Sequence, residues 1–506
     1  MALKTLWWAV LCAVLLAVVP VFAQGIYEPV FTETDCWFDL PGVVCGYLTV
    51  PEDRGDPMGN QVELAVAIIE SQSANPLPDP VIYLEGGPGG AALLGIESLL
   101  DHPLLADRDL IVFDQRGTGF SVPSLNCYEL EEDEGENAVQ ACRDRLLDEG
   151  VNLDAYNTAA TAADVNDLRL ALGYEQVNLL GVSYGTKAAL TTLRDFPTVI
   201  RSAVVDSVYP PEIDDLVQQS SAFVGAYEAL FDRCAADADC ADAFPDLEAN
   251  FYGTLDSYNE TPLIIETDDG ELELTGDEIL GQLFQALYDS TRLPYLPYAL
   301  DLLSYTDDEE AVLEGYDVLT GAYLPDDPVE DSGASAVEDS AAVQELFDDL
   351  GDIDDSEGQA YSVDCSEEYQ LSDTDAAYAA AEDAPGPVVN YLISGIDSAM
   401  ADCAVWNVET ANPREALRVS SDVPVLLLSG AMDPITPVAA AASAALGLPA
   451  GTAVVFPVAG HGISFTDTAA GDCAKSLVLG FLDDPTAPVD TACVAQTDGI
   501  AFYTGE

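Results

Sequence analysis

Histidines and basic residues are scarce in this chain of 506 residues. It has two histidines, and 15 lysines and arginines against 91 aspartates and glutamates, so its formal net charge is −76. A surface of this charge repels phosphates, which excludes nucleic acid as a partner and disfavours anionic substrates and membranes. We attribute the acidic excess to solubility in a salty or acidic habitat; the alternative is a role in attracting cationic peptides.

Beyond its N-terminal segment, the chain has no apolar run long enough to span a membrane. Residues 1–23 combine Lys4, an apolar run from Leu6 to Val19 and the small-residue cleavage pattern Val21-Phe22-Ala23, which together predict a signal peptide. The alternative is a membrane anchor, but this run is shorter than the roughly 20 residues of a spanning helix. We therefore expect a secreted or extracytoplasmic protein, with no stable membrane insertion after cleavage.

The chain also lacks the cysteine spacing of a zinc site. It has no Cys-x-x-Cys pair and too few histidines, so we expect no metal. Of its eleven cysteines, Cys12 leaves with the signal peptide, and the remaining ten form the even set that a disulfide framework requires. The sequence does not prove their connectivity. Pairing between neighbours is the simplest hypothesis: Cys36–Cys45, Cys127–Cys142, Cys234–Cys240, Cys365–Cys403 and Cys473–Cys493.

The most informative motif is Gly-Val-Ser-Tyr-Gly at residues 181–185, which fits the nucleophile elbow G-x-S-x-G. A short apolar run at residues 176–180 precedes it, and a helical pattern at residues 186–193 follows. Strand, sharp turn and helix are the context that this motif needs. The glycines leave room for a serine held in a strained backbone. Ser183 is therefore the predicted nucleophile.

Two segments near the C-terminus complete a catalytic triad. His461 lies in Ala-Gly-His-Gly at residues 459–462, and Asp433 lies in Gly-Ala-Met-Asp-Pro at residues 430–434. The order Ser, Asp, His along the chain is that of the α/β-hydrolases. We predict Ser183, Asp433 and His461 as nucleophile, orienting acid and base. The other histidine, His102, has no motif around it and is expected to lie in a loop or in the core.

Apolar runs alternate with helical patterns on both sides of this motif. An antiparallel pair is expected at residues 43–50 and 62–70. Buried strands are expected at 81–84, 109–113, 176–180, 202–207, 423–429 and 452–456, with an amphipathic helix at 162–172. This alternation predicts a mostly parallel sheet flanked by helices, the α/β-hydrolase fold class. The last two strands each end beside a triad residue, as expected for a site at the carboxyl ends of strands.

The stretch between these halves has a different character. Helical patterns dominate residues 211–412, for example at 222–234 and 277–288, with one hairpin at 263–274 that turns at residues 268–270. Residues 326–358 are acidic and form either a mobile loop or a solvated helix face, and we favour partial disorder. We expect a mainly helical cap at 211–412, inserted between hydrolase core segments 24–210 and 413–506.

A glycine-rich turn, Glu-Gly-Gly-Pro-Gly-Gly at residues 85–90, follows the strand at 81–84. In this position α/β-hydrolases build the oxyanion hole, which needs backbone N–H groups aimed at the developing negative oxygen. We assign one donor to the N–H of Tyr184 and the other to that of Gly87, or failing that Gly86. The alternative is a simple turn without a catalytic role.

These motifs together resemble the proline iminopeptidase and tripeptidyl aminopeptidase family, and the C-terminal part is similar to its TAP-like region. The resemblance covers nearly all of the mature chain and is weakest at residues 326–358. It rests on the following segments: 86–90, Asp-Gln-Arg-Gly-Thr-Gly-Phe-Ser at 114–121, 181–185, Cys365, Cys-Ala-Val-Trp at 403–406, Asp-Pro-Ile-Thr-Pro at 433–437 and 460–462.

The resemblance implies a secreted serine aminopeptidase that needs no cofactor and whose partner is a peptide with a free N-terminus. It would release short peptides or single residues through an acyl-enzyme. Arg116 would support the oxyanion loop; its alternative role is a structural ion pair with Asp114 or a neighbour. Glu85 departs from the histidine frequent in proline iminopeptidases, which favours the tripeptidyl branch or another specificity over strict proline specificity. Family members often hold the substrate amine with cap carboxylates, and the sequence does not indicate which.

Two other functional classes stay open. A small-molecule esterase, lactonase or amidase could use the same fold and triad, and the cap would decide between them. A non-catalytic surface binding protein is the third reading, although an intact triad argues against it. The sequence leaves the oligomeric state and the length of the released peptide undetermined.

Overall fold

A nine-stranded sheet forms the centre of the structure, a computed structural model that describes residues 27–132, 136–267, 270–325 and 353–505. The predicted signal peptide lies outside the described residues, as do residues 326–352 of the predicted disordered segment. Neighbouring strands follow the order β1-β2-β3-β5-β4-β6-β7-β10-β11. In chain order they are β1 (Val30–Thr34), β2 (Val43–Pro51), β3 (Gln61–Ile69), β4 (Val81–Leu84), β5 (Leu110–Phe113), β6 (Val177–Val182), β7 (Ile200–Asp206), β10 (Val425–Gly430) and β11 (Gly451–Phe456).

The sheet changes from antiparallel to parallel along its width. β1, β2, β3 and β5 pair antiparallel, whereas β5, β4, β6, β7, β10 and β11 run parallel. Every residue of β4, β5, β6 and β10 is buried, which explains their unbroken apolar runs: helices cover both faces of the parallel part. The structure therefore has the predicted α/β-hydrolase fold.

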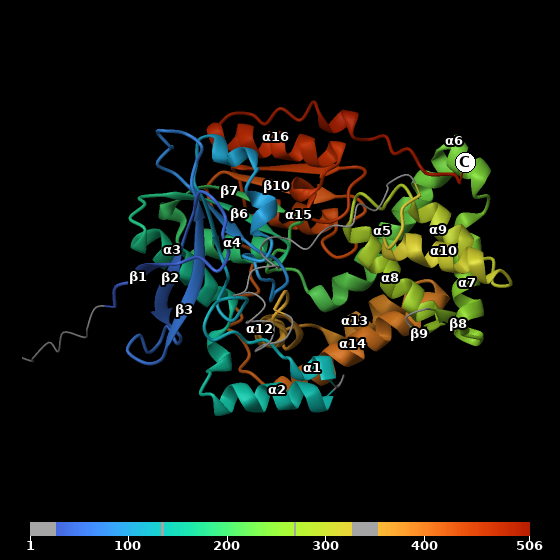
Figure 1. Cartoon of the computed structure of the whole chain (residues 1–506), viewed down its shortest axis with the longest axis horizontal. Helices are drawn as coiled ribbons and strands as arrows, with labels where there is room; N and C mark the ends of the chain where they lie inside the picture. Colours follow the sequence, from blue (N-terminus) through green and yellow to red (C-terminus); the bar gives the residue numbers. More distant parts are fainter. Residues whose placement is uncertain (1–26, 133–135, 268–269, 326–352, 506) are drawn as a thin grey trace, which may run out of the picture.

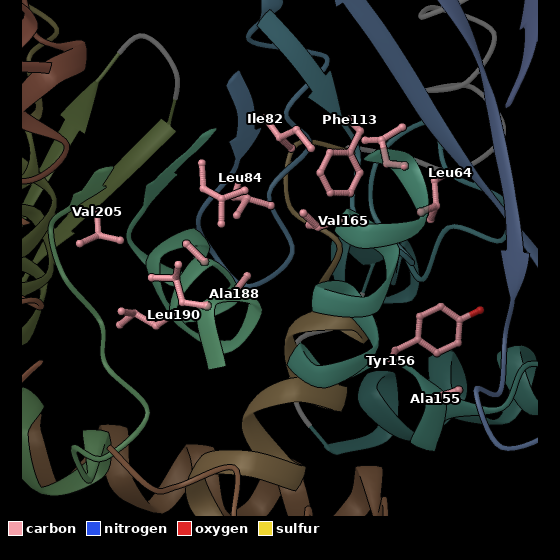
Figure 2. Packing of buried hydrophobic residues seen from close by; sticks show 14 of the residues in the cluster. Leu64, Ile82, Leu84, Phe113, Ala155, Tyr156, Val165, Ala188, Leu190 and Val205 are labelled. Atoms are coloured by element: carbon pink, nitrogen blue, oxygen red, sulfur yellow. The ribbon is translucent and has the colours of Figure 1, made fainter. Parts of the chain in front are cut away.

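Helices pack on the two faces of the sheet and form two apolar cores. One core packs against α3 and α4, and Figure 2 shows Ile82, Phe113 and Val205 of the sheet facing Val165 and Leu190 of these helices. The other core lies under α16. The helices of this part are α1 (Glu129–Glu132), α2 (Glu136–Asp148), α3 (Thr158–Ala171), α4 (Tyr184–Asp195), α15 (Val438–Ala445) and α16 (Ala469–Asp483).

Residues 211–412, which we call the insertion, lie between β7 and β10 and are mainly helical. Most of them share an apolar core of their own and lie to one side of the sheet (Figure 1), whereas Cys365, Cys403 and Trp406 pack into the core of the sheet part. Their elements are α5 (Asp215–Ala236), α6 (Ala238–Ala243), α7 (Leu247–Glu260), α8 (Gly276–Tyr288), α9 (Leu296–Leu302), α10 (Glu309–Thr320), α12 (Glu357–Val363), a π-helical turn (Asp364–Tyr369), α13 (Thr374–Glu382), α14 (Gly386–Trp406), and the hairpin β8 (Leu263–Thr267) and β9 (Gly270–Leu274). The predicted hairpin turn at 268–269 lies outside the described residues.

Five disulfides join neighbouring cysteines: Cys36–Cys45, Cys127–Cys142, Cys234–Cys240, Cys365–Cys403 and Cys473–Cys493. They lie both in the sheet part and in the insertion. Within the part of the chain that the structure describes, no helix has the length and apolar character needed to cross a membrane.

Candidate active site

The turn between β6 and α4 holds Ser183 in a strained conformation. Its φ is 54° and its ψ is −127°, a region that residues other than glycine rarely occupy. The two flanking glycines are required by close contacts. A Cβ at Gly185 would lie 2.0 Å from the carbonyl oxygen of Leu84, and a Cβ at Gly181 would lie 2.4 Å from that of Gly185. The backbone thus has the geometry of a nucleophile elbow at the carboxyl end of β6.

Asp433 and His461 follow the next strands of the sheet and are hydrogen-bonded to each other. Asp433 lies after β10 and His461 after β11, and 2.9 Å separates His461 Nδ1 from Asp433 Oδ2. Asp433 also accepts hydrogen bonds from the N–H groups of Ile435 (3.0 Å) and Thr436 (2.8 Å) and from the Thr436 hydroxyl (2.5 Å). These donors fix the carboxylate so that it holds the imidazole in one orientation.

The two groups shift each other's pKa in opposite directions. Burial lowers the pKa of His461, but Asp433 outweighs it, with help from Asp206 and Glu85, so that the net shift is upward. Burial raises the pKa of Asp433, but His461 and the Thr436 hydrogen bonds outweigh it, and the net shift is downward. The site is therefore built to stabilise an imidazolium beside a carboxylate, the charge state that a general base reaches during acyl transfer.

The remaining ring nitrogen of His461 is available for chemistry. Nε2 is buried, and among the described residues it has no hydrogen-bond partner, Ser183 included. The loop that carries His461 is nevertheless connected to the elbow through Asp206. The backbone carbonyl of Asp206 accepts a hydrogen bond from the Ser183 N–H (3.0 Å), and its carboxylate accepts one from the N–H of Ile463, two residues after His461. Catalytic hydrogen bonds are often long before substrate binds, so this geometry is compatible with a resting base.

Asp206 and Ser207, at the end of β7, position the histidine loop, a role that the motif analysis missed. The buried Asp206 carboxylate accepts from the N–H of Ile463 (3.2 Å) and from the N–H (2.7 Å) and hydroxyl (2.6 Å) of Ser464. The Ser207 hydroxyl accepts from the Gly462 N–H at 2.8 Å. The only sequence signal was a polar Asp-Ser pair closing a buried strand.

The hydrogen bonds of the glycine-rich turn favour the N–H of Gly87 over that of Gly86 as an oxyanion donor. The Gly86 N–H donates to its neighbour Glu85 at 2.8 Å, and the Tyr83 hydroxyl donates to the same carboxylate at 2.9 Å. Gly86 is thus already engaged, whereas Gly87 is exposed, with φ at +103°. Tyr184 is the first residue of α4, so its N–H has no partner within the helix. Gly87 and Tyr184 stay the predicted donors.

The insertion contacts this turn through its backbone. The Ala91 N–H donates to the carbonyl of Asp354 and the Ser356 N–H donates to that of Gly89, both at 2.9 Å. Residues 353–358, the end of the segment expected to be partly disordered, thus pack against the glycine-rich turn, and Ile353 is fully buried.

Arg116 does not touch Asp114, the first partner considered. Its buried guanidinium forms two hydrogen bonds with Asp164 (2.7 and 2.8 Å) and donates to the carbonyls of Glu52 and Ala155. Asp114 instead accepts from the N–H groups of Leu93 and Phe120. The structural ion pair is therefore present, with Asp164 as the partner.

The insertion also reaches the histidine loop through the end of α8. The rings of Tyr288 and His461 are 4.7 Å apart, and the His461 N–H donates to the Tyr288 carbonyl at 3.1 Å. Burial raises the pKa of Tyr288, and the carboxylates of Asp433, Asp215 and Asp355 raise it further. Two acidic residues of the insertion, Asp215 and Asp355, therefore contribute to the raised pKa of Tyr288.

Asp215 belongs to an acidic cluster beside the nucleophile helix, which we define as Asp215, Asp364, Glu367 and Glu368; the two glutamates are buried and the two aspartates half-buried. Lys187 of α4 forms ion pairs with Glu367 (3.0 Å) and Glu368. Burial and neighbouring carboxylates raise the pKa of Asp215 to about 7 and that of Asp364 well above its usual range. The acidic cluster therefore holds more carboxyl groups than its lysine neutralises.

His102 and the candidate metal ligands complete the set of residues considered from the sequence. His102 is buried, its Nδ1 accepts from the Leu104 N–H at 3.2 Å, and burial lowers its pKa to about 4. Within the described ranges no group of three or more histidines, cysteines or carboxylates has the arrangement of a metal site.

Comparisons with known proteins match both halves of the chain. A model of the alpha/beta hydrolase fold family matches residues 79–262, and a model of TAP-like proteins matches residues 391–493. The chain is 33% identical over 234 residues to a tripeptidyl aminopeptidase of Streptomyces coelicolor, but this alignment covers only 40% of the chain and 43% of that protein.

Two relatives align along most of their length. The chain is 25% identical to serine protease Hip1 of Mycobacterium tuberculosis over 489 residues, which cover 88% of this chain and 86% of that protein. It is 27% identical to carboxylesterase B of the same organism over 481 residues, which cover 88% and 85% of the two chains.

Proposed function

Because the chain is an α/β-hydrolase with a TAP-like C-terminal region, we propose that it is an exported serine aminopeptidase. It releases short peptides, or single residues, from free N-termini. The observation that carries this proposal is the strained Ser183 at the same sheet edge as the hydrogen-bonded His461–Asp433 pair. The relatives named as tripeptidyl aminopeptidase and serine protease support a peptide as the substrate.

The acylation step uses the free nitrogen of the imidazole. His461 Nε2 takes the proton of the Ser183 hydroxyl as the oxygen attacks the substrate carbonyl, while Asp433 stabilises the imidazolium through Nδ1. The tetrahedral oxyanion accepts hydrogen bonds from the N–H groups of Gly87 and Tyr184, and the positive end of the α4 dipole adds to this stabilisation. His461 then gives its proton to the leaving amine, and water hydrolyses the acyl-enzyme.

Recognition of a free N-terminus requires an anion at a fixed place near the nucleophile, since a buried ammonium is costly without an opposite charge. Asp215 fits this role best. It is the first residue of α5 in the insertion and lies in an acidic cluster whose four carboxyl groups share the ion pairs of one lysine, Lys187. A substrate ammonium would supply the missing positive charge and keep Asp215 ionised.

Blocked substrates and a charge-removing variant test this assignment. N-acetylation of a peptide p-nitroanilide should lower kcat/KM by at least about a hundredfold, since it removes one member of a buried charge pair. Asp215→Asn should lower kcat/KM for the free peptide and leave p-nitrophenyl acetate hydrolysis nearly unchanged. Asp232→Asn, at the exposed far end of the same helix, is the matched control and should change neither.

An esterase is the second candidate function, favoured by the similarity to carboxylesterase B. An esterase would hydrolyse acetylated and free substrates equally and would not depend on Asp215. Equal cleavage of the two peptide forms therefore overturns the aminopeptidase proposal and supports an esterase or an endopeptidase.

Export is part of the proposal as well. Five disulfides suit an oxidising compartment, where such bonds form and persist. The N-terminal segment of residues 1–23 has the composition of a signal peptide.

A further inference from the structure

A cavity of about 520 Å³ lies within the insertion, between α5, α8 and α14. Aromatic and aliphatic side chains form much of its wall, including those of Phe223, Phe284, Tyr391 and Leu392. Ile435, two residues after Asp433, also lines it, so the cavity reaches the loop that carries the catalytic acid. Its volume falls within the range of pockets that bind small ligands.

A series of ring contacts connects this cavity to the catalytic histidine. The Tyr288 ring lies 4.7 Å from that of His461, and the Phe284 ring lies 5.3 Å from that of Tyr288. Phe223 then lies 5.3 Å from Phe284 and 6.0 Å from Tyr391. The cavity thus borders the site through these packed rings and through Ile435, and the triad chemistry does not use it.

Helix α5 runs from the acidic cluster to the cavity. It begins at Asp215, and Gln219 and Phe223, which line the cavity, follow at spacings of four residues on the same helix face. A substrate residue whose ammonium meets Asp215 would therefore extend its side chain toward the cavity.

Two polar features of the wall limit what the cavity can bind. The Ser220 hydroxyl is buried and, among the described residues, has no hydrogen-bond partner, so it can accept or donate to a ligand. Asp277 supplies a carboxylate that disfavours acidic side chains. The remaining wall includes the polar residues Gln219, Ser394 and Ser398, but apolar side chains supply the larger part of its surface, which suits a large uncharged group.

We propose that this cavity is a specificity subsite for a large apolar or aromatic side chain of the acyl part of the substrate, the part that Ser183 retains. The inference rests on the proposed peptidase function for its substrate, but the cavity and its connection to His461 do not depend on that function. The subsite gives the enzyme a preference for phenylalanine or leucine over alanine at the residue that carries the free ammonium.

Gly395 allows the cavity to be filled without disturbing the fold. It lies in α14, lines the cavity, and an added Cβ there meets no atom within 4 Å. Gly395→Leu places a branched side chain in the cavity and favours the helix, since glycine is a poor helix former. Gly225→Leu is the matched control: Gly225 is an exposed α5 residue with equally open surroundings that does not line the cavity. Thermal unfolding of both variants checks folding.

The test compares free-amine p-nitroanilides with phenylalanine, leucine, alanine or glutamate as the first residue. The wild type should cleave the phenylalanine and leucine substrates at least roughly tenfold more efficiently than the alanine one, and the glutamate substrate least. Gly395→Leu should remove this preference by lowering kcat/KM for the large substrates about tenfold or more, with the alanine substrate within about twofold of wild type. Gly225→Leu should keep the full preference.

Ester substrates separate this inference from the proposed function. If no free-amine peptide is cleaved, the aminopeptidase proposal fails, and p-nitrophenyl 3-phenylpropionate and p-nitrophenyl acetate then test the cavity alone. Loss of the phenylpropionate preference in Gly395→Leu supports the subsite. Equal losses on large and small substrates, or no preference in the wild type on the substrates that it cleaves, overturn it.

Discussion

The sheet edge and the insertion treat buried charge in different ways. At the sheet edge these buried carboxylates have compensating partners: Asp433 pairs with His461, Asp164 pairs with Arg116, and Asp114 and Asp206 accept hydrogen bonds from N–H groups. The insertion supplies the four carboxyl groups of the acidic cluster, whose ion pairs come from Lys187 of α4, and the pKa of Asp215 rises to about 7. Carboxylates with compensating partners suit a site that carries out chemistry, whereas carboxyl groups that lack such partners suit a site that binds a cation. We therefore propose that the sheet carries the catalytic residues and that the insertion recognises the substrate.

The largest expected effect falls on the sheet edge. Ser183→Ala should lower kcat by roughly 10⁶, as removal of a nucleophile does in other serine hydrolases, and should leave the fold intact. A serine-directed phosphonate should label Ser183 alone, as mass spectrometry of the peptides can verify. Ser221→Ala, an exposed position on α5, is the control. Activity retained in Ser183→Ala, or label on another serine, would remove the triad and with it the contrast between the regions.

A smaller effect is expected on the pH dependence of kcat/KM, which reports how strongly the acidic groups shift the pKa of His461. Because Asp433, Asp206 and Glu85 together outweigh burial, the pKa of His461 is raised, and kcat/KM should increase with pH through an apparent pKa above about 6.5. Only neutral His461 can accept the serine proton, so activity is lost on the acidic side. Raising NaCl from about 0.05 M to about 1 M should move this apparent pKa downward by screening the exposed carboxylates.

The salt series would contradict this prediction if the apparent pKa stayed constant. A profile that does not move with salt would mean that only the buried partners set the pKa of His461 and that the net charge of the surface does not reach the site. The difference between the sheet edge and the insertion would then be larger, since the surface carboxylates would not affect the pKa of His461.

The two regions also differed in what the sequence revealed. The parallel strands were predictable because strands buried on both faces are continuous apolar runs, and the segments of Ser183, Asp433 and His461 carry their own local motifs. The antiparallel pair at 43–50 and 62–70 was confirmed as β2 and β3, whereas β1 was missed because its exposed residues have no apolar pattern.

The contacts of the insertion could not be predicted in the same way. Lys187 and Glu368 are 181 residues apart, and no local spacing indicates that they meet. The same holds for Tyr288 on His461 and for Asp206 on Ser464, which depend on how separate elements pack. The ion-pair alternative for Arg116 named Asp114 or a neighbour, whereas the structure pairs Arg116 with Asp164, 48 residues further along the chain. Local motifs fix the chemistry, but only tertiary packing fixes its surroundings.

The smallest expected effect concerns the stability of the insertion. In the folded protein, burial and Glu368 raise the pKa of Asp215 to about 7 from the ordinary 3.8, so the folded state binds this proton more tightly than the unfolded state. The stabilisation is fully present below the unfolded pKa and is lost as pH rises through the folded pKa, between about pH 4 and pH 7. Unfolding should therefore begin at a lower temperature at about pH 7.5 than at about pH 5.

Replacement of this carboxyl group tests the assignment directly. Asp215→Asn should raise the free energy of unfolding at neutral pH by on the order of 1 kcal/mol, a few degrees in Tm, and should flatten its pH dependence. The exposed control Asp232→Asn should follow the wild type across the same range. If Asp215→Asn keeps the wild-type slope, Asp215 is already neutralised by Lys187, and the acidic cluster has no unmatched charge to offer a substrate. Substrate binding and stability therefore place opposite demands on Asp215: the charge that the substrate ammonium needs is the same charge that destabilises the insertion at neutral pH.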